Sequence, residues 1–247
     1  MQHFKRRNKH TNSLNGKKSL SFVKLTLITI LFFACSSSLF ALSPGDTILY
    51  PGLGLGVSTG NADTWSGHDV GFVNSNINGW KDAKTDYYSI AFSFGTGFDY
   101  LITDSLAITT GLSFDYLPYK IVWQKRDPLV SDIKLDIEFA YITIPIGIRY
   151  YFSYFIVGGG IYYAFNIMSD IKLKEPMGDE KHNLDAGNVF GFFIDLGLNF
   201  NVLEKNNFLV FVKYRQDLNA AYDDTGFHVT KIEMKALTLN LAYGIKL

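Results

Sequence analysis

The segment Tyr88-Ser-Ile-Ala-Phe-Ser-Phe-Gly-Thr-Gly-Phe-Asp-Tyr-Leu-Ile102 decides the fold. Its even positions carry large and mostly apolar side chains, whereas its odd positions, such as Ser93 and Asp99, are mostly small or polar. A period of two residues indicates a β-strand, because successive side chains of a strand point to opposite faces. The segment therefore predicts a strand with one large apolar face and one small polar face.

Seven further segments alternate in the same way, which gives eight predicted strands in all. The eight ranges are 49–59, 88–102, 106–116, 142–152, 155–166, 190–200, 208–218 and 237–247. Each has about the ten residues that a tilted strand needs to cross a bilayer. No run of apolar residues after the N-terminal segment is long enough for a transmembrane helix.

The connections between these strands alternate between short and long. Short turns are expected around 103–105, 152–154 and 204–207, and longer loops over 60–86, 124–132, 174–187 and 219–230. Short turns on one side and long loops on the other are typical of outer-membrane barrels, whose short turns are periplasmic. The sequence predicts an all-β protein, an eight-stranded antiparallel transmembrane β-barrel in an up-and-down meander, with both ends in the periplasm.

The composition of the two faces indicates which one points outward. In a soluble β-sandwich or lipocalin, eight rows of Phe, Ile, Leu and Tyr would have to fill the interior. The lumen of an eight-stranded barrel is crowded and suits small side chains, so the large apolar face is expected to meet lipid. Aromatic residues near the strand ends, including Tyr88, Tyr100 and Tyr243, fit the belts found at membrane interfaces.

The region before 142–152 breaks the pattern. Ile133, Leu135, Ile137 and Phe139 are odd-numbered, whereas the apolar residues from Ile142 onward are even-numbered. The change of phase indicates either a β-bulge or an extension of the strand beyond the bilayer. Pro145 is unusual inside a strand because it donates no ladder hydrogen bond.

The N-terminal segment has the layout of a secretory signal peptide. Residues 1–24 are polar and basic, 25–33 are apolar, and Leu39-Phe-Ala41 offers a cleavage site. We predict a signal peptide over 1–41 and a barrel domain over 42–247. The seven basic residues of 1–41 leave 16 basic against 23 acidic residues in the remainder. An acidic barrel repels polyanions, so no nucleic-acid partner is expected.

One strand carries a recognisable signature. The run Tyr141-Ile-Thr-Ile-Pro-Ile-Gly-Ile-Arg-Tyr-Tyr-Phe152 resembles a motif of the outer membrane protein β-barrel domain family, which is related to OmpX-like and opacity-type barrels. The closing stretch Leu239-Asn-Leu-Ala-Tyr-Gly-Ile-Lys-Leu247 is similar to that family as well. The resemblance covers residues 48–247 and implies the barrel fold, with membrane lipids and the barrel-assembly machinery as partners. It implies no single function, because the family is functionally diverse.

Sequence motifs for catalysis or for cofactor binding are absent. No HExxH, CxxC, GxSxG or Walker-type motif occurs, and His68, His182 and His228 fall in predicted loops. A barrel enzyme would need a histidine beside a carboxylate, for which His228 with Asp223 or Asp224 is the nearest option. The loop 60–86 could form a binding surface or a weak metal site, although a loop that packs on itself is favoured. Its candidate residues are Asp63, Trp65, His68, Asp69 and Trp80. We therefore expect no catalytic residue, no cofactor and no metal.

Charged residues on the small polar face are the most specific site feature. They are Asp99, Asp115, Arg149, Asp195, Lys213, Arg215 and Asp217. Both signs are present and nearly balanced, which favours a paired network over a conducting path. Counting from the short turn at 204–207 places Asp195 and Arg215 at comparable depth, so we expect these two residues to be partners.

These features lead to one functional interpretation with two alternatives. The first is a non-enzymatic outer-membrane protein that acts through its surface loops in adhesion, in binding of an extracellular ligand or in envelope integrity. The second is a narrow OmpW-like channel for small or apolar solutes. The third is a lipid-modifying barrel enzyme, which the motif search favours least.

Overall fold

The computed structural model describes residues 42–64, 80–125, 133–175, 178–183, 186–203, 206–221 and 229–247. These residues all lie within one compact unit, Leu39–Leu247. The predicted signal peptide, 1–41, lies outside the described residues and stays a prediction.

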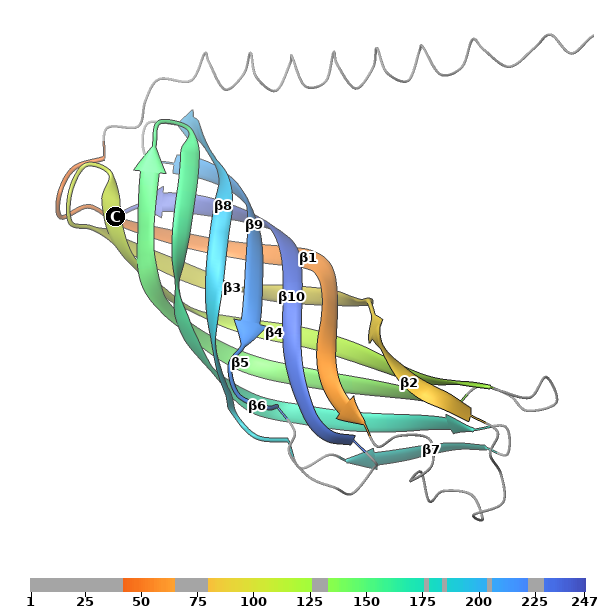
Figure 1. The fold of residues 1–247 in the computed structure, drawn as a ribbon. Helices are drawn as coiled ribbons and strands as arrows, with labels where there is room; N and C mark the ends of the chain where they lie inside the picture. Colours follow the sequence, from red (N-terminus) through yellow and green to blue (C-terminus); the bar gives the residue numbers. More distant parts are fainter. Residues whose placement is uncertain are drawn as a thin grey trace, which may run out of the picture. The chain divides into compact units, whose positions relative to one another are not determined.

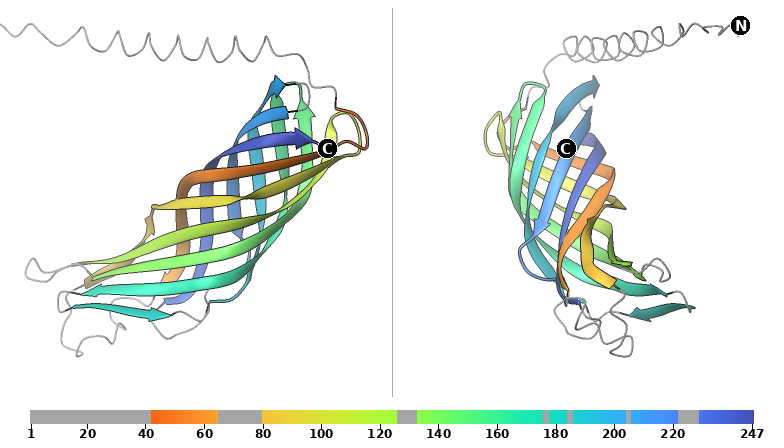
Figure 2. Two further views of the ribbon diagram at one scale, coloured as in Figure 1. Left: turned by 180° about the vertical axis from the view of Figure 1, so that it is seen from behind. Right: turned by 45° about the vertical axis from the view of Figure 1, so that its right-hand side comes forward.

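The described chain contains ten strands (Figure 1). They are β1 (Thr47–Thr64), β2 (Trp80–Tyr87), β3 (Ser89–Leu101), β4 (Leu106–Lys125), β5 (Ile133–Phe152), β6 (Phe155–Glu175), β7 (Gly178–Asn183), β8 (Val189–Leu203), β9 (Asn206–Asp217) and β10 (Val229–Lys246). Eight of them form an antiparallel ring in the order β1, β3, β4, β5, β6, β8, β9, β10, which the pairing of β1 with β10 closes. Figure 2 shows this ring from two further sides. The predicted eight-stranded meander is confirmed.

The two ends of the described barrel lie beside the short turns. Thr47 pairs with Tyr100, which precedes the turn between β3 and β4, and Ile48 pairs with Lys246. An even number of strands in the ring returns the chain to the side where it began. Both ends therefore share the side that the short turns define.

Two strands lie outside the ring, and sequence analysis had assigned both to loops. β2 pairs with β4, and β7 pairs with β6, at the end opposite the short turns (Figure 1). β4 and β6 have 20 and 21 residues, so they continue well beyond the length that a bilayer requires. Their protruding edges carry unpaired backbone groups, which β2 and β7 satisfy. The predicted loops 60–86 and 174–187 are thus partly strand.

Large apolar side chains cover the outside of the ring, as predicted. Phe94, Leu196 and Leu239 are each more than half exposed, whereas Asp99 and Asp195 on the opposite face are fully buried. No helix among the described residues is long and apolar enough to cross a membrane.

Beyond the membrane-facing band the two faces exchange character. In β5 the inward positions are odd-numbered throughout, and they change from Arg149 and Thr143 to the buried apolar Tyr141, Phe139 and Ile137. The outward positions change over the same stretch from exposed isoleucines to Glu138, Asp136 and Lys134. The extension beyond the bilayer is therefore the correct reading of the phase change, and β5 itself contains no bulge.

The bulge lies on the neighbouring strand. Ala140 pairs with Met168 and Tyr141 pairs with Asn166, so Ile167 of β6 is the extra residue. An extra residue reverses which positions of a strand point inward. Inward positions of β6 are accordingly even-numbered before Ile167 and odd-numbered after it, as at Ile171.

Two apolar clusters close the interior at its ends. The outer cluster fills the extension, with Leu117, Ile137, Phe139 and Ile232 among its members. The inner cluster lies near the short turns and includes Ile48, Leu101 and Leu209. The polar part of the ring's interior lies between these two clusters.

Candidate functional site in the barrel interior

The first group of charges surrounds Arg149 of β5. Its Nη1 donates to Asp99 Oδ2 over 2.8 Å and its Nη2 donates to Asp195 Oδ2 over 2.9 Å. Tyr50 donates to Asp99 Oδ1 over 2.9 Å, and the hydroxyl of Tyr151 donates to Asp99 Oδ2. We call these five residues the Arg149 cluster. Charge-assisted hydrogen bonds of this kind are the strong ones, so Arg149 ties β3, β5 and β8 together.

Local backbone structure explains how Arg149 reaches Asp195. The strand between them is β6, where Gly158 pairs with Arg149 on one side and with Asp195 on the other. Gly158 points inward and has no side chain, so the guanidinium can pass over it. A Cβ at this position would lie 3.6 Å from the Cβ and Cγ of Arg149.

The second group surrounds Arg215 of β9. Its Nη1 donates to Asp115 Oδ2 over 2.7 Å, and its Nη2 lies 3.4 Å from Asp217 Oδ1. The hydroxyl of Tyr162 donates to Asp217, and the backbone N–H of Met234 donates to Asp217 Oδ2 over 3.2 Å. We call these five residues the Arg215 cluster.

Lys213 is the inward-facing residue next to Arg215 on β9. Its surroundings differ from those of the two arginines. Its Nζ is 5.2 Å from the ring centroid of Phe193 and 5.8 Å from that of Phe211. No carboxylate forms an ion pair with it among the described residues. Asp195 is its register partner across the ladder. However, Asp195 Oδ2 accepts a hydrogen bond from Arg149, and the buried Oδ1 of Asp195 has no hydrogen-bond partner.

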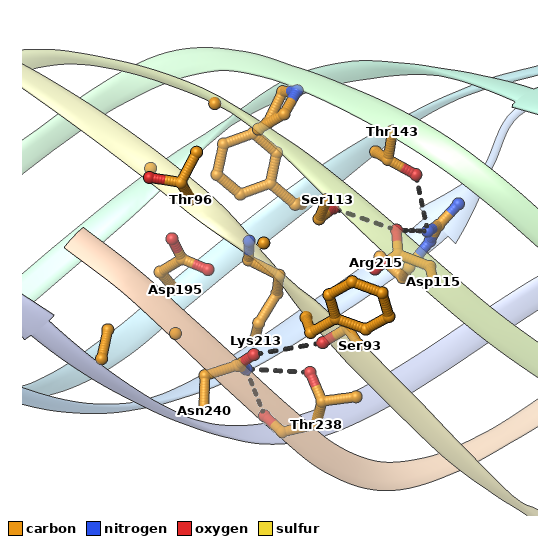
Figure 3. Close-up of a pocket in the computed structure, with 18 of the residues that line it drawn as sticks. Ser93, Thr96, Ser113, Asp115, Thr143, Asp195, Lys213, Arg215, Thr238 and Asn240 are labelled. Carbon is orange, nitrogen blue, oxygen red and sulfur yellow. Dashed lines mark hydrogen bonds and ion pairs between the residues drawn. The ribbon is translucent and has the colours of Figure 1, made fainter. Parts of the chain in front are cut away.

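A cavity of about 90 Å³ lies between the two clusters (Figure 3). Charged side chains of both clusters border it, together with Lys213, Ser93, Ser113 and Asn240. Glycines of β1, β3 and β4, among them Gly52, Gly95 and Gly111, also line it. The cavity therefore has both polar and apolar walls, and it lies inside a barrel whose two ends are apolar.

The β4–β5 ladder is interrupted at this depth. The register runs from Thr110↔Ile146 directly to Ser113↔Thr143, so Pro145 has no partner on β4, although it pairs with Tyr162 on β6. Proline lacks the N–H that β4 would accept. The hydroxyl of Thr110 donates to the Pro145 carbonyl over 2.9 Å and fills part of the gap.

The structure places all seven sequence-predicted lumen residues in the interior, but it changes one pairing. Asp195 and Arg215 are not partners: Asp195 pairs with Arg149, and Arg215 pairs with Asp115 and Asp217. The ladder sets Asp195 opposite Lys213, and Arg215 opposite Phe193. The expectation was wrong because it considered only neighbouring strands, whereas arginine side chains also reach across the lumen.

Aromatic residues that the sequence did not predict as part of the site contact these charges. Arg149 lies 4.7 Å from the Tyr50 ring centroid, and Arg215 lies 4.2 Å from that of Tyr162. Tyr162, Phe193 and Phe211 are large residues at positions where the alternation expects small ones, and this exception was the available signal.

The loop candidates remain predictions. His68, His228, Trp65, Asp69, Asp223 and Asp224 lie outside the described residues. The side chains of Asp63, Trp80 and His182 lie outside the described part as well. Among the side chains that the structure describes, no group of three His, Cys, Asp or Glu could hold a metal ion.

The fold and this interior define an outer-membrane β-barrel. The model of the outer membrane protein beta-barrel domain matches residues 51–223, more than half of the chain, so the protein belongs to that family and spans the outer membrane. No curated protein matches the chain.

Several solved outer-membrane proteins are similar to this chain. The attachment invasion locus protein Ail of Yersinia pestis, in complex with the heparin analogue sucrose octasulfate, is 12% identical over 83% of this chain and 99% of that chain, with a TM-score of 0.41. OprG from Pseudomonas aeruginosa is 14% identical over 85% of this chain and 99% of that chain, with a TM-score of 0.37. The outer membrane protease OmpT from Escherichia coli is 12% identical over 86% of this chain and 100% of that chain, with a TM-score of 0.43.

Proposed function

We propose that the protein is a non-enzymatic surface-binding barrel that presents a rigid extension outside the membrane. The reversal of faces in β5 carries this proposal. Membrane crossing alone does not need Ile137, Phe139 and Tyr141 on the inward face, where they are fully buried. A sheet with an apolar core and a charged outer face is the construction of a water-soluble domain.

Ion pairs on the outer face of the extension support this role. The Asp136 carboxylate forms two ion pairs, with Oδ1 3.5 Å from Lys120 Nζ and Oδ2 2.7 Å from Lys174 Nζ. Oε1 of Glu138 lies 2.5 Å from Lys172 Nζ. Each exposed pair stabilises little by itself, but several pairs across β4, β5 and β6 favour one fixed surface. A fixed surface binds a partner at a lower entropic cost than flexible loops do.

The closed interior argues against the channel alternative. A solute would have to cross two apolar clusters and pass Arg149 and Arg215, whose ion pairs are buried. Eight strands leave an interior that side chains can fill. The proposal therefore assigns function to the outer surface and a structural role to the lumen charges.

A comparison of three strains tests the proposal. One lacks the protein, one carries the wild type, and one carries a barrel in which 126–132, the connection between β4 and β5, is replaced by a short Gly-Asn turn. Adherence to cultured epithelial cells, resistance to detergent and conductance in planar bilayers are measured, after surface amounts have been matched. We expect the replacement to reduce adherence and leave detergent resistance unchanged, with no conductance from either barrel. A stable open pore in the wild type, or equal adherence of all three strains, contradicts the proposal.

A further inference from the structure

One outward surface of the extension is rich in lysine. Strands β4, β5, β6 and β7 lie side by side there (Figure 1). The lysines that point outward from them, which we call the lysine face, are Lys120, Lys134, Lys172, Lys174 and Lys181. The carboxylates with described side chains on the same surface are Asp136, Glu138 and Asp170. The register adds one acidic position, Asp179 opposite Lys174, so lysines are in the majority either way.

Two pairs of these lysines lie directly opposite each other across the ladders. Lys134 of β5 is the register partner of Lys174 on β6, and Lys172 of β6 is the register partner of Lys181 on β7. Like charges at directly opposite positions destabilise a sheet. Carboxylates relieve only part of this repulsion, because Lys134 forms no ion pair with the described residues. An anion from outside the chain would relieve the rest.

Ammonium groups, rather than carboxylates, are presented to the surroundings. The four ion-paired lysine side chains are 38–57% exposed, whereas their carboxylate partners are only 13–23% exposed. Three of the lysines pair with a carboxylate that lies two residues nearer the membrane than their own register position. These pairs are Lys172–Glu138, Lys174–Asp136 and Lys181–Asp170. The three ammonium groups therefore lean toward the apolar band.

The lysine face begins where the lipid-facing band ends. On β5, Glu138 lies two residues beyond Ala140, the last apolar residue on the outward side. Two residues of a strand span about 6.6 Å, which a barrel tilt of about 35–45° reduces to about 5 Å of height. Lipid headgroups extend about 5–8 Å beyond the hydrocarbon on each side. The Lys172 ammonium, which contacts Glu138, therefore lies at the depth of the headgroups.

We propose that the lysine face binds phosphate groups of anionic lipids in the outer leaflet, with Lys172 and Lys181 as the principal ligands. The face continues the lipid-facing surface upward, so neighbouring headgroups meet it directly, and lysine binds phosphate as a point charge. A soluble polyanion is disfavoured, because residues 42–247 carry 16 basic against 23 acidic side chains and repel it at a distance. A lipid in the same leaflet needs no such long-range attraction. This role does not depend on the proposed adhesion, which is tested at the connection 126–132.

Unfolding of the full-length barrel in phosphatidylcholine nanodiscs tests the proposal. The nanodiscs contain either lipid A with two phosphates or the same lipid with both phosphates removed, so only the headgroup charge differs. We expect the wild type to unfold about 2–4 °C higher with the phosphorylated lipid, at a concentration several times its dissociation constant.

Two variants show whether the lysine face causes this difference. The double variant Lys172→Gln with Lys181→Gln should lose most of it. In the phosphate-free lipid this variant should unfold close to the wild type, because the loss of two exposed ion pairs is offset by the relief of repulsion. Lys246→Gln is the matched control and should keep the difference, since Lys246 lies at the end with the short turns, where it pairs with Asp46.

Native mass spectrometry of the barrel in micelles gives a second measurement that does not depend on unfolding. The wild type should retain phosphorylated lipid A, and the double variant should retain clearly less. Equal unfolding temperatures of the wild type in the two lipids, or a difference that survives the double substitution, would overturn the proposal. So would a wild type that soluble polyphosphate stabilises and phosphorylated lipid A does not.

Discussion

Arg215 and Asp115 join two strands that stand opposite each other in the ring. Nη1 of Arg215, on β9, lies 2.7 Å from Oδ2 of Asp115, on β4. Three strands separate β4 from β9 in either direction around the barrel. The ion pair therefore braces the full width of the lumen, and both side chains are largely buried.

Breaking this brace should destabilise the barrel. Arg215→Met leaves Asp115 and Asp217 without their cation, and removing one partner of a buried pair costs about 3–5 kcal/mol. Adding Asp115→Asn should recover part of that loss, because it removes one of the stranded charges. Reversible urea unfolding in micelles measures both variants. Lys120→Met is the control, since Lys120 belongs to an exposed pair and should cost less than about 1 kcal/mol. Similar losses for Arg215→Met and Lys120→Met would exclude the brace.

Gly158 should be needed for the contact between Arg149 and Asp195. A Cβ at Gly158 would lie only 3.2 Å from the backbone carbonyl oxygen of Ile148, and the methyl groups of Gly158→Val would occupy the path of the guanidinium. Overpacking of this kind costs about 1–3 kcal/mol, and the Arg149–Asp195 pair should also be lost. The matched control is Gly187→Val, because a Cβ at Gly187 would meet nothing within 4 Å. If the two variants unfold at the same urea concentration, Gly158 has no such role.

Lipid contact can be tested with one substitution on each face of β3. Phe94 is 57% exposed and faces outward, so Phe94→Arg should cost about 2–4 kcal/mol near the bilayer centre. Ser93 faces the cavity, and Ser93→Asn should cost clearly less. The measurement is unfolding from lipid vesicles. Equal costs at the two positions would contradict the assignment of inside and outside.

The exchange of faces along β5 predicts opposite responses to one substitution. Ile137 is fully buried in the extension, so Ile137→Ala should cost about 2–5 kcal/mol through the cavity that it leaves. Ile146 is 56% exposed on the membrane-facing part, and Ile146→Ala should cost much less. Unfolding of both variants in micelles provides the comparison. A larger loss at Ile146 would contradict the soluble character of the extension.

Labelling of intact cells tests the orientation. Gly187 and Asp104 are both exposed, but Gly187 lies just before β8 at the extension end, and Asp104 lies in the short turn between β3 and β4. A cysteine at Gly187 should react with a membrane-impermeant maleimide, and a cysteine at Asp104 should react only after the membrane is permeabilised. The reverse labelling would contradict the assigned orientation of the barrel in the membrane.

Alternation predicts the ring because it is a local property of each strand. The pattern from Tyr88 to Ile102 determines both the strand and its faces, and the structure follows it. Alternation does not predict β2 and β7, because their polar sequences, WKDAKTDY and GDEKHN, show no apolar face. Their positions depend on the protruding edges of β4 and β6, which only the folded ring reveals.

The ion-pair partners of the lumen charges could be predicted from the sequence only in part. The seven charged residues follow from alternation, since each lies on the small polar face. Their pairing does not follow, because Arg149 reaches Asp195 across β6, and Arg215 reaches Asp115 across the lumen. Such contacts depend on ring closure and on the missing side chain at Gly158, neither of which is a local property.

The exchange of faces also fixes how deep the barrel sits in its membrane. Glu138, Asp170 and Lys235 are the first outward charges above the apolar band on β5, β6 and β10. Because a strand rises about 3.3 Å per residue, sinking the barrel by two residues would draw this charged ring into hydrocarbon. Raising it would bring lipid-facing side chains such as Leu239 toward water. The barrel is therefore matched to one hydrocarbon thickness, and a thicker bilayer must thin around it or expel it.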